Sequence, residues 1–380
     1  MDLRFTPEEM SFRDELRAFF HSAIPKEIRQ KVQSELHLSK EEYVSVHKTL
    51  HQRGWAVPHW PQAWGGQGWS AVQRYLWMEE MQIASVPSPL QFNVFMVGPV
   101  IAQFGNEAQK KRFLPDTASL DIWWGQGFSE PDAGSDLSGL KTRADRHGDH
   151  YVINGQKAWA TLAQHADWIF LLARTDANAK KQNGISFFLV NMKTKGITRR
   201  PTVTIDGDHE VNEVFFDDVE VPAENLVGEE NRGWDYAKFL LSNERTSIAR
   251  VGVSKARLAR AKRLASETSK NGRPLAQDPE FKRRVAKLEV QVKALELTQL
   301  RVVAAEKSDS DKPDPNSSIL KIRGSELQQA TIELLKDIAG PRALEGANTG
   351  AYFNTRKVSI YGGSNEIQRT IIAKAFLGMS

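Results

Sequence analysis

The chain has 380 residues, 40% of them hydrophobic, so it is long enough for two or three domains with ordinary buried cores. It contains no cysteine, which excludes disulfides, thiolate catalysis and Cys-ligated metal sites and leaves any redox chemistry to a bound cofactor. The 51 basic and 47 acidic residues are interspersed and give a formal net charge of +4, so nucleic acid is a weak candidate partner.

The beginning of the sequence has no basic segment followed by an apolar one, and no small-residue cleavage site. No run approaches the roughly 20 apolar residues needed to cross a bilayer. We therefore expect a cytoplasmic protein without a membrane span.

The first third of the chain is predicted to be helical. Residues 8–23 and 70–84 place apolar side chains three and four positions apart, as amphipathic helices do. Between them, residues 55–70 contain two prolines and three glycines, which favours a loop whose tryptophans serve packing. We assign residues 1–121 to an N-terminal α-helical domain.

From about residue 122 the pattern changes to short runs rich in Val, Ile, Phe and Trp, separated by turn residues. Hairpins should connect these strands, so the sheet is expected to be largely antiparallel, and the Asn154-Gly155 pair is typical of a tight hairpin turn. We assign residues 122–229 to a middle β domain. The predicted strands are 151–161, 167–175, 184–192, 196–205 and 212–222.

Helical periodicity returns in the last third, residues 230–380, which we assign to a C-terminal helical bundle. Residues 307–318 are charged and contain two prolines, so we expect a loop between helices there. The fold class is therefore α+β, with the sheet between two helical domains. Within this last third we predict one long helix, whose apolar face consists of Phe281, Val285, Leu288, Val292 and Leu295.

Two short patterns are weak signals. The string GQGWSA at residues 66–71 matches a dinucleotide fingerprint, but no apolar strand precedes it, so an NAD-dependent oxidoreductase is a disfavoured alternative. His47 and His51 stand four positions apart on one predicted helix, yet no third ligand is evident. We expect two ordinary histidines there and no metal site.

Chemistry is indicated by residues 125–144, where small and hydroxyl residues surround Glu130, so that backbone N–H groups and hydroxyls are offered to a polar ligand. In the strand that follows, Trp159 and Thr161 stand two apart and should project on one face. An aromatic side chain beside a hydroxyl suits a planar heterocycle, although a plain loop could have a similar composition.

Five motifs in one order, SEPDAGSD, NGQKAWAT, EVNEVFFDDVEVP, GEENRGW and YGGSNEIQR, resemble the acyl-CoA dehydrogenase family over essentially the whole chain. The resemblance implies FAD as cofactor and conversion of an acyl-CoA thioester to the trans-2-enoyl-CoA, with hydride transfer to flavin N5, as in β-oxidation of lipids or dicarboxylates. It also implies the cofactor-binding residues, which are Gln126, Phe128, Ser129, Gly134, Ser135, Trp159, Thr161, Gly363, Ser364 and Glu366, with Asn365 between the last two.

Further roles are implied by the same resemblance. Ser135 also faces the thioester, and Arg245 lies in the coenzyme A channel. Residues 336–340 match a stretch that contacts FAD from a neighbouring subunit, although DIAGPRA departs there from the family's usual glycine-rich version.

The catalytic base departs from the family's commonest pattern. Gly362 occupies the place where most members have a glutamate, whereas Glu244-Arg245 matches the earlier Glu-Arg pair of a minority. The resemblance therefore implies that Glu244 abstracts the α-proton. The alternative is that Glu244 is a surface carboxylate and this chain a catalytically silent subunit.

The resemblance is greatest to large subunits of pimeloyl-CoA and steroid side-chain dehydrogenases. The arginine that usually reaches FAD across the dimer is missing, and Thr268 and Lys270 stand nearby instead. A homotetramer or an α2β2 assembly with a related small subunit is implied, with an electron-transferring flavoprotein as acceptor. The acyl group stays open among dicarboxylyl, steroid side-chain and fatty acyl groups, because distant segments line such pockets.

Overall fold

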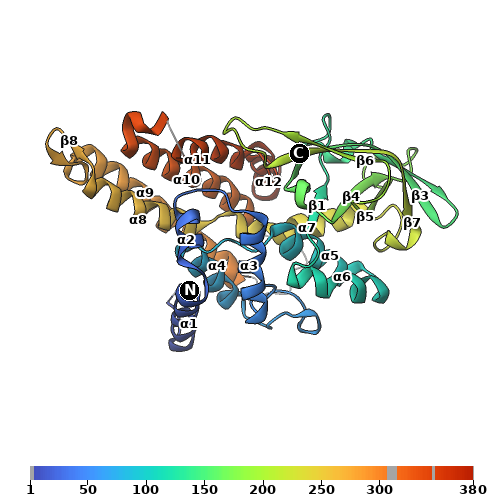
Figure 1. The fold of residues 1–380 in the computed structure, drawn as a ribbon, viewed down its shortest axis with the longest axis horizontal. Coiled ribbons are helices and arrows are strands. Elements are labelled where there is room, and N and C mark those ends of the chain that lie inside the picture. The colour runs from blue at the N-terminus through green and yellow to red at the C-terminus, as the bar shows by residue number, and fades with distance from the viewer. Residues whose placement is uncertain (1–3, 306–314, 345–346, 380) are drawn as a thin grey trace. The chain divides into compact units, whose positions relative to one another are not determined.

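The computed structural model describes residues 4–305, 315–344 and 347–379, with the side chains at 242–248, 305, 342, 344 and 347–348 outside that description. The chain forms two compact units. The first comprises residues 1–46, 69–88 and 244–380, and the second comprises residues 47–68 and 89–243. Helices α3 (Lys40–Gln52) and α7 (Gly233–Ile248) have residues in both (Figure 1).

The first unit begins with helices α1 (Pro7–Ala23) and α2 (Lys26–Gln33), and α1 packs against α4 (Ala71–Ile83). Thr6 and Ser70 each close a capping box, because their hydroxyls accept a backbone N–H of the first turn while Glu9 and Gln73 reach back to the cap. The two predicted N-terminal helices are confirmed.

The rest of the first unit is a helical bundle in which α10 packs against α8, α9, α11 and α12. The predicted apolar face of α9 is confirmed, since all five of its residues are buried in the core that α8 and α10 complete. The bounds are α8 Val251–Glu267, α9 Pro279–Ala305, α10 Asn316–Ala339, α11 Ala347–Thr355 and α12 Asn365–Leu377, with a small hairpin of β8 (Ser269–Lys270) and β9 (Arg273–Pro274).

The expected loop at 307–318 is wrong at its end, and residues 306–314 lie outside the described part of the chain. Helix α10 already begins at Asn316, and Ser317 and Ser318 are buried. The reason is that a proline directly before a helix suits its first turn, where no backbone N–H partner is needed, so Pro315 starts the helix instead of prolonging the loop.

After the end of α3, the second unit contains most of the predicted loop, in which the described regular structure is the short 3-10 turn Gln62–Trp64. Trp60 is buried and donates its indole N–H to the carbonyl oxygen of Val94 at 2.7 Å. Val94 lies in the π-helix Phe92–Val97, and Pro99, five positions later, has no N–H to donate to its carbonyl oxygen. Helices α5 (Gly98–Phe104) and α6 (Glu107–Ser119) follow.

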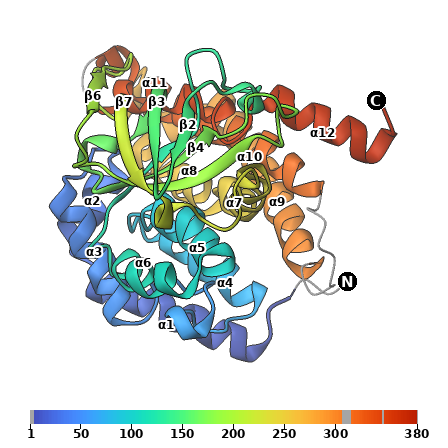
Figure 2. The same cartoon turned by 90° about the vertical axis from the view of Figure 1, so that its right-hand side faces the viewer.

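A seven-stranded sheet forms the main part of this unit, in the order β1-β4-β2-β3-β7-β6 with β5 paired to β4. The pairings are antiparallel except for β1 with β4 and a single β2–β4 pair, so the largely antiparallel expectation is confirmed. Figure 2 shows β3 and β7 side by side. The strands are β1 Trp124–Gly127, β2 Arg143–His147, β3 His150–Thr161, β4 Trp168–Arg174, β5 Ile185–Asn191, β6 Ile197–Thr202 and β7 Val211–Pro222.

The predicted hairpin turn at Asn154-Gly155 is wrong, because β3 continues through both residues. The turn between β2 and β3 lies earlier, at Gly148, whose φ is 62°. The Asn154 amide instead donates to Asp218 of β7 at 3.0 Å. Gly155 is needed inside the strand, since its φ is 151° and a Cβ there would stand 2.5 Å from the Thr142 hydroxyl.

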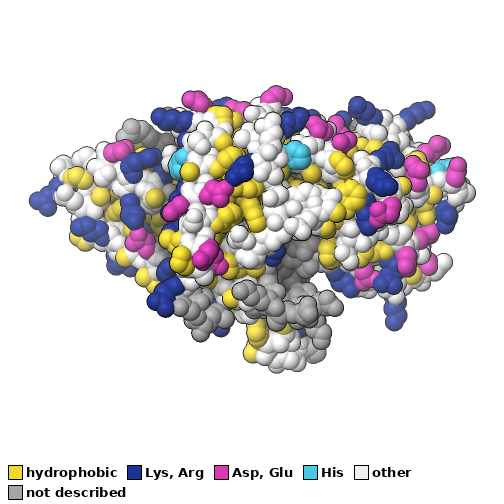
Figure 3. All heavy atoms as spheres, turned by 90° about the horizontal axis from the view of Figure 1, so that it is seen from below, with side chains coloured by type: hydrophobic (Ala, Val, Ile, Leu, Met, Phe, Trp, Pro, Cys, Tyr) yellow, Lys and Arg dark blue, Asp and Glu magenta, His cyan; other side chains and the backbone are white. Residues whose placement is uncertain are grey.

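Two surface properties follow from the described residues. None of their helices is long and apolar enough to cross a membrane. On the face drawn in Figure 3, Lys and Arg side chains alternate with Asp and Glu side chains, and neither sign gathers into one region.

Candidate functional site

Residues 128–142 form a loop whose base is closed by one buried carboxylate. Glu130 is 6% exposed, and its two oxygens accept the backbone N–H groups of Lys141 at 2.6 Å and Thr142 at 2.9 Å. The side chain of Lys157, from β3, donates to the same carboxylate at 2.8 Å and to the carbonyl oxygen of Phe128 at 3.1 Å. The side chain of Glu130, held by Lys157 of β3, therefore joins both ends of the loop to the sheet.

This ion pair perturbs both of its groups. Burial lowers the pKa of Lys157 to about 8, against the raising effect of Glu130. Burial alone would raise the pKa of Glu130, but the charge of Lys157 and the hydrogen bonds from Lys157, Thr142 and Lys141 hold that pKa below its usual value. The pair is therefore ionised near neutral pH.

The tip of the loop carries Gly134 and Ser135, both exposed. Behind it, Arg174 of β4 donates to the carbonyl oxygens of Ser138 at 2.8 Å and Leu140 at 3.2 Å. A Cβ added at Gly134 would meet no heavy atom within 4 Å. The chain itself therefore leaves space beside this glycine, where a ligand could approach the backbone.

Trp159 stands on a β-bulge of β3. The register with β7 slips between Lys157 and Ala160, so β3 has one extra residue there. Trp159 takes a φ of 60°, in the left-handed region, and its side chain is 63% exposed. Because bulky residues adopt this backbone conformation at a cost, an exposed indole held in it is a mark of a functional position.

The bulge also decides which β3 side chains share a face. Lys157 and Trp159 are two apart, yet Lys157 is fully buried while Trp159 is exposed. Beyond the bulge, alternation resumes, with Ala160 buried and Thr161 half-buried. The buried Asn212 of β7 donates to the Ala160 carbonyl at 3.2 Å and so supports the segment that carries Thr161.

The hydroxyl loop and the bulge lie side by side. The backbone N–H of Ala158 donates to the carbonyl oxygen of Ser129 at 2.8 Å. Phe128 is buried with its ring edge-on to Phe170 at 5.6 Å, while Gln126 of β1 pairs with Phe170 in the ladder. The segments that carry Ser129 and Trp159 are therefore joined directly, Gln126 and Phe128 lie just before Ser129 in the chain, and Gly134 and Ser135 lie at the tip of the loop that follows it.

The C-terminal group of predicted residues lies in the first unit. Ser364 caps α12, with its hydroxyl accepting the Ile367 N–H at 3.3 Å, and Gly363 before it has a φ of 79°. Asn365 is 5% exposed and hydrogen-bonds Ser325 at 3.1 Å. Hydrogen bonds from its own backbone N–H and from Ser364 hold the pKa of Glu366 below its usual value.

The remaining predicted positions are described in part. Lys336, near the end of α10, lies with its ammonium 4.7 Å from the centroid of the Tyr352 ring, and Gly340 ends the helix with a φ of 58°. Glu244 and Arg245 lie within α7, but their side chains are outside the described residues.

The sequence analysis missed the Glu130–Lys157 pair. The signal was present, because Tyr151, Ile153 and Lys157 fall at odd positions of one strand and strict alternation places all three on the same, buried side. A lysine in phase with core residues needs a buried partner.

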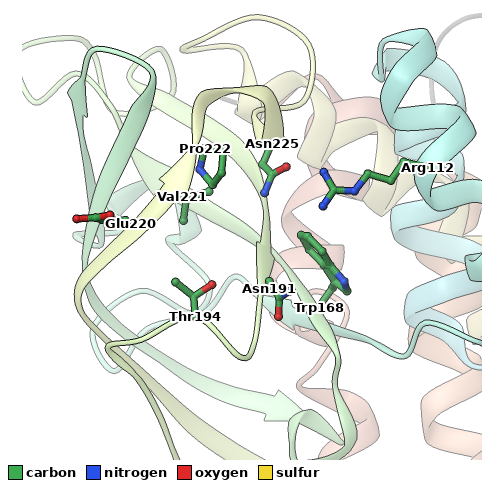
Figure 4. Close-up of a pocket in the computed structure, with 8 residues that line it drawn as sticks. All are labelled: Arg112, Trp168, Asn191, Thr194, Glu220, Val221, Pro222 and Asn225. Atoms are coloured by element: carbon green, nitrogen blue, oxygen red, sulfur yellow. The ribbon is translucent and has the colours of Figure 1, made fainter.

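Two other features do not belong to this site. A cavity of about 220 Å³ lies between Arg112 and Trp168 on one side and Glu220 on the other, and none of the predicted site residues lines it (Figure 4). The described residues hold no cluster of His, Asp or Glu suited to a metal ion. His47 is buried and hydrogen-bonds the Ala118 carbonyl at 2.9 Å.

Helices, a sheet and helices in chain order, with an exposed indole beside a hydroxyl-rich loop on the sheet, define a fold class of α+β enzymes. Family models described as the N-terminal, middle and C-terminal domains of acyl-CoA dehydrogenase match residues 6–121, 125–219 and 231–377. The chain belongs to the acyl-CoA dehydrogenase family, and it is an enzyme of the oxidoreductase class.

Similar proteins agree with this assignment. The chain is 32% identical to "Acyl-CoA dehydrogenase FadE26" of Mycobacterium tuberculosis, over 100% of this chain and 99% of that protein. Among solved structures, the "Tcur3481-Tcur3483 steroid ACAD" is 31% identical with a TM-score of 0.89. The ChsE4-ChsE5 complex from Mycobacterium tuberculosis is 30% identical with a TM-score of 0.86, and in both structures all of each chain is covered. The resemblance inferred from the motifs is confirmed.

Proposed function

We propose that this chain uses FAD to dehydrogenate an acyl-CoA thioester between its α- and β-carbons, giving the trans-2-enoyl-CoA. The observation that carries the proposal is the exposed, left-handed Trp159 beside the Ser129 segment, within a family of FAD-binding flavoproteins. FAD, when bound, accepts the hydrogen that leaves the β-carbon as hydride.

The residues in hand fit such a cofactor. A flat ring system needs an exposed aromatic face and nearby hydrogen-bonding groups, which Trp159 and Thr161 offer, and Gly134 leaves room for a close approach. We propose that the residues holding FAD are Gln126, Phe128, Ser129, Gly134, Ser135, Trp159 and Thr161, together with Gly363, Ser364 and Glu366. Ser135 also binds the thioester end of the substrate, and Arg245 binds its coenzyme A part.

Abstraction of the α-proton requires a carboxylate of the chain itself. We propose that Glu244 takes the α-proton, because Gly362 cannot act as a base at the position where most of the family has a glutamate. A carboxylate beside an apolar acyl group is desolvated, which makes it a stronger base near neutral pH.

Glu244→Gln tests the base directly, since it keeps the shape and removes the proton acceptor. We expect turnover to fall by about 10²-fold or more while FAD is retained, and Glu244→Asp to keep partial activity with a changed pH profile. Asp235→Asn, at a partly exposed carboxylate in the same helix, is the matched control and should leave turnover unchanged. Near-normal turnover of the Gln variant would make Glu244 a surface carboxylate and this chain a silent subunit.

The substrate class is tested by anaerobic titration of the purified flavoprotein with acyl-CoA thioesters. A steroid side-chain acyl group has the most support, because a relative that is similar over the whole chain is described as a steroid ACAD. Dicarboxylyl and fatty acyl thioesters are titrated in parallel as the other two candidate substrate classes. Bleaching of the flavin absorbance by one class names the substrate, and a protein without any flavin absorbance would overturn the FAD proposal and reopen the NAD alternative.

The assembly is proposed to be α2β2 with a related small subunit. Two similar solved structures carry paired names, ChsE4-ChsE5 and Tcur3481-Tcur3483. Moreover, Lys270, near the place of the missing arginine, is engaged by Asp278 at 2.9 Å. Co-expression with a related chain followed by sizing should give a heterotetramer, whereas a stable, FAD-saturated homotetramer would contradict this. An electron-transferring flavoprotein is the proposed acceptor, to be tested by its reduction in a coupled assay.

A further inference from the structure

The Glu130–Lys157 pair is a buried ionic contact between the sheet and the loop 128–142. Lys157 is 0% exposed, and its ammonium bridges the carboxylate of Glu130 and the carbonyl oxygen of Phe128. Both carboxylate oxygens are used, because they also accept the N–H groups of Lys141 and Thr142. Three segments, residues 128–130, residues 141–142 and strand β3, thus meet at one ion pair.

The location of this pair connects it to the two parts of the proposed flavin site. Lys157 directly precedes Ala158, whose N–H holds the Ser129 carbonyl, and then Trp159 on the bulge. Glu130 directly follows Ser129 and closes the loop that carries Gly134 and Ser135. A shift of the pair would therefore move the exposed indole and the hydroxyl loop relative to each other.

We propose that Glu130 and Lys157 are positioning residues, which hold the Ser129–Ser135 loop against the Trp159 bulge so that both can bind one planar cofactor. The proposal rests on the proposed function, because it concerns the same site. Neither residue needs to touch the cofactor. They act through the backbone groups of Phe128, Lys141 and Thr142.

An ionic pair suits this role better than an apolar contact. The carboxylate accepts three hydrogen bonds in fixed directions, whereas apolar side chains would fill the space without fixing the loop's orientation. The lowered pKa of Glu130 and a Lys157 pKa of about 8 leave both groups charged near neutral pH, so the contact is complete there. Buried pairs are also screened little by salt.

The test compares Lys157→Met, Glu130→Gln and the double variant with Lys181→Met. Lys181 pairs with Asp136 of the same loop at 2.8 Å, but both side chains are more than half exposed, so it is a matched control for losing a lysine beside this loop. The double variant leaves no unpaired buried charge, so it should fold even where the single variants do not.

Hydrogen exchange of the flavin-free proteins is the first readout. We expect faster exchange in residues 128–142 and 157–161 of the Glu130 and Lys157 variants, with the helices of residues 251–305 unchanged, and wild-type exchange in Lys181→Met. Exchange that rises evenly along the chain, or does not rise in this loop, would overturn the positioning role.

Flavin affinity is the second readout. We expect each Glu130 and Lys157 variant to bind FAD about tenfold or more weakly, as is typical when a group that supports binding residues is removed. A loosened loop with wild-type flavin affinity would leave the pair as a fold element only and overturn the inference. A wild-type chain that binds no flavin would instead overturn the proposed function, while the exchange measurement would still decide whether the pair orders the loop.

Discussion

The backbone N–H of Ala158 donates to the carbonyl oxygen of Ser129 at 2.8 Å, which joins the bulged strand to the hydroxyl-rich loop. Neither residue contributes its side chain to this contact, so side-chain identity alone could not reveal it. Because Trp159 directly follows Ala158, this contact places the residue with the exposed indole next to the start of the loop that carries Gly134 and Ser135. The proposed cofactor site therefore depends on backbone geometry at the bulge.

Gly134→Ala should separate binding from folding. Since an added Cβ meets nothing within 4 Å and Gly134 has no left-handed φ, the flavin-free protein should change stability by less than about 0.5 kcal/mol. A ligand that approaches the glycine closely should bind more weakly, as titration of the flavin-free chain with FAD and acyl-CoA would measure.

Gly148→Ala is the control for that substitution, because Gly148 also has free space but a φ of 62°. It should cost about 1 kcal/mol in stability and leave flavin affinity unchanged. Equal ligand affinities for the Gly134 variant and the wild type would place the ligand elsewhere.

Trp159→Gly should move stability and cofactor affinity in opposite directions. Glycine adopts the left-handed backbone readily, and the indole is 63% exposed, so the flavin-free protein should be stabilised by up to about 1 kcal/mol. Flavin affinity should fall because the aromatic face is lost. Denaturant unfolding and flavin titration check the two effects.

Trp159→Phe keeps both the backbone strain and an aromatic ring, so it should resemble the wild type in stability and retain part of the flavin affinity. If Trp159→Gly bound flavin as tightly as the wild type, the indole would not contact the cofactor.

His47 should make the protein sensitive to mild acid. Burial lowers the pKa of His47 to about 4. If the ring took up a second proton, the N–H at Nδ1 would have no acceptor. The folded-state pKa lies below the unfolded value near 6.5, so stability present above pH 6.5 is lost as the pH falls toward 4. Between pH 7 and pH 5 the loss should be about 2 kcal/mol.

The substitution His47→Gln should remove this part of the pH dependence, since glutamine can still donate to the Ala118 carbonyl and does not titrate. Urea unfolding at the two pH values measures it. His51→Gln, at an exposed position, should keep the wild-type pH dependence. If the His47 variant kept the wild-type pH dependence of stability, the acid sensitivity would come from other groups.

Asn93→Leu should destabilise the second unit strongly. The Asn93 amide is fully buried, donates to the carbonyl oxygens of Thr117 and Ile122, and accepts the N–H of Trp124. Leucine would leave these three backbone groups without partners, at a total cost of about 3 kcal/mol or more. Thermal unfolding checks this, with the exposed Asn178→Leu as a control that should shift the midpoint little.

Periodicity alone predicted much of the fold. The apolar face of α9, from Phe281 to Leu295, and the capped helices that follow Thr6 and Ser70 needed only local information, because spacing and caps act within one helix. The five predicted strands are confirmed, although β6 ends at Thr202, because alternation along a strand is also a local pattern. The two domain boundaries at 121/122 and 229/230 stay a prediction.

The two wrong predictions concern residue types that are compatible with two different local structures. Asn154-Gly155 is a common turn pair, but here a glycine was required by the close approach of Thr142 inside a strand. Pro315 could end a loop or start a helix, and it starts α10. In each case a neighbour in space or in the next element decided between the two.

The sequence by itself determined the order of helices and strands, the family and the residue types available to the site, since these depend on periodicity and on motifs that are local in the chain. Only the tertiary structure decided that Trp159 is exposed, although strict alternation would place it on the same buried side as Lys157, which lies two residues earlier and pairs with Glu130. The physical reason is the bulge, because one extra residue against β7 reverses which side chains face the core, and the register between two strands distant in sequence sets where that residue falls.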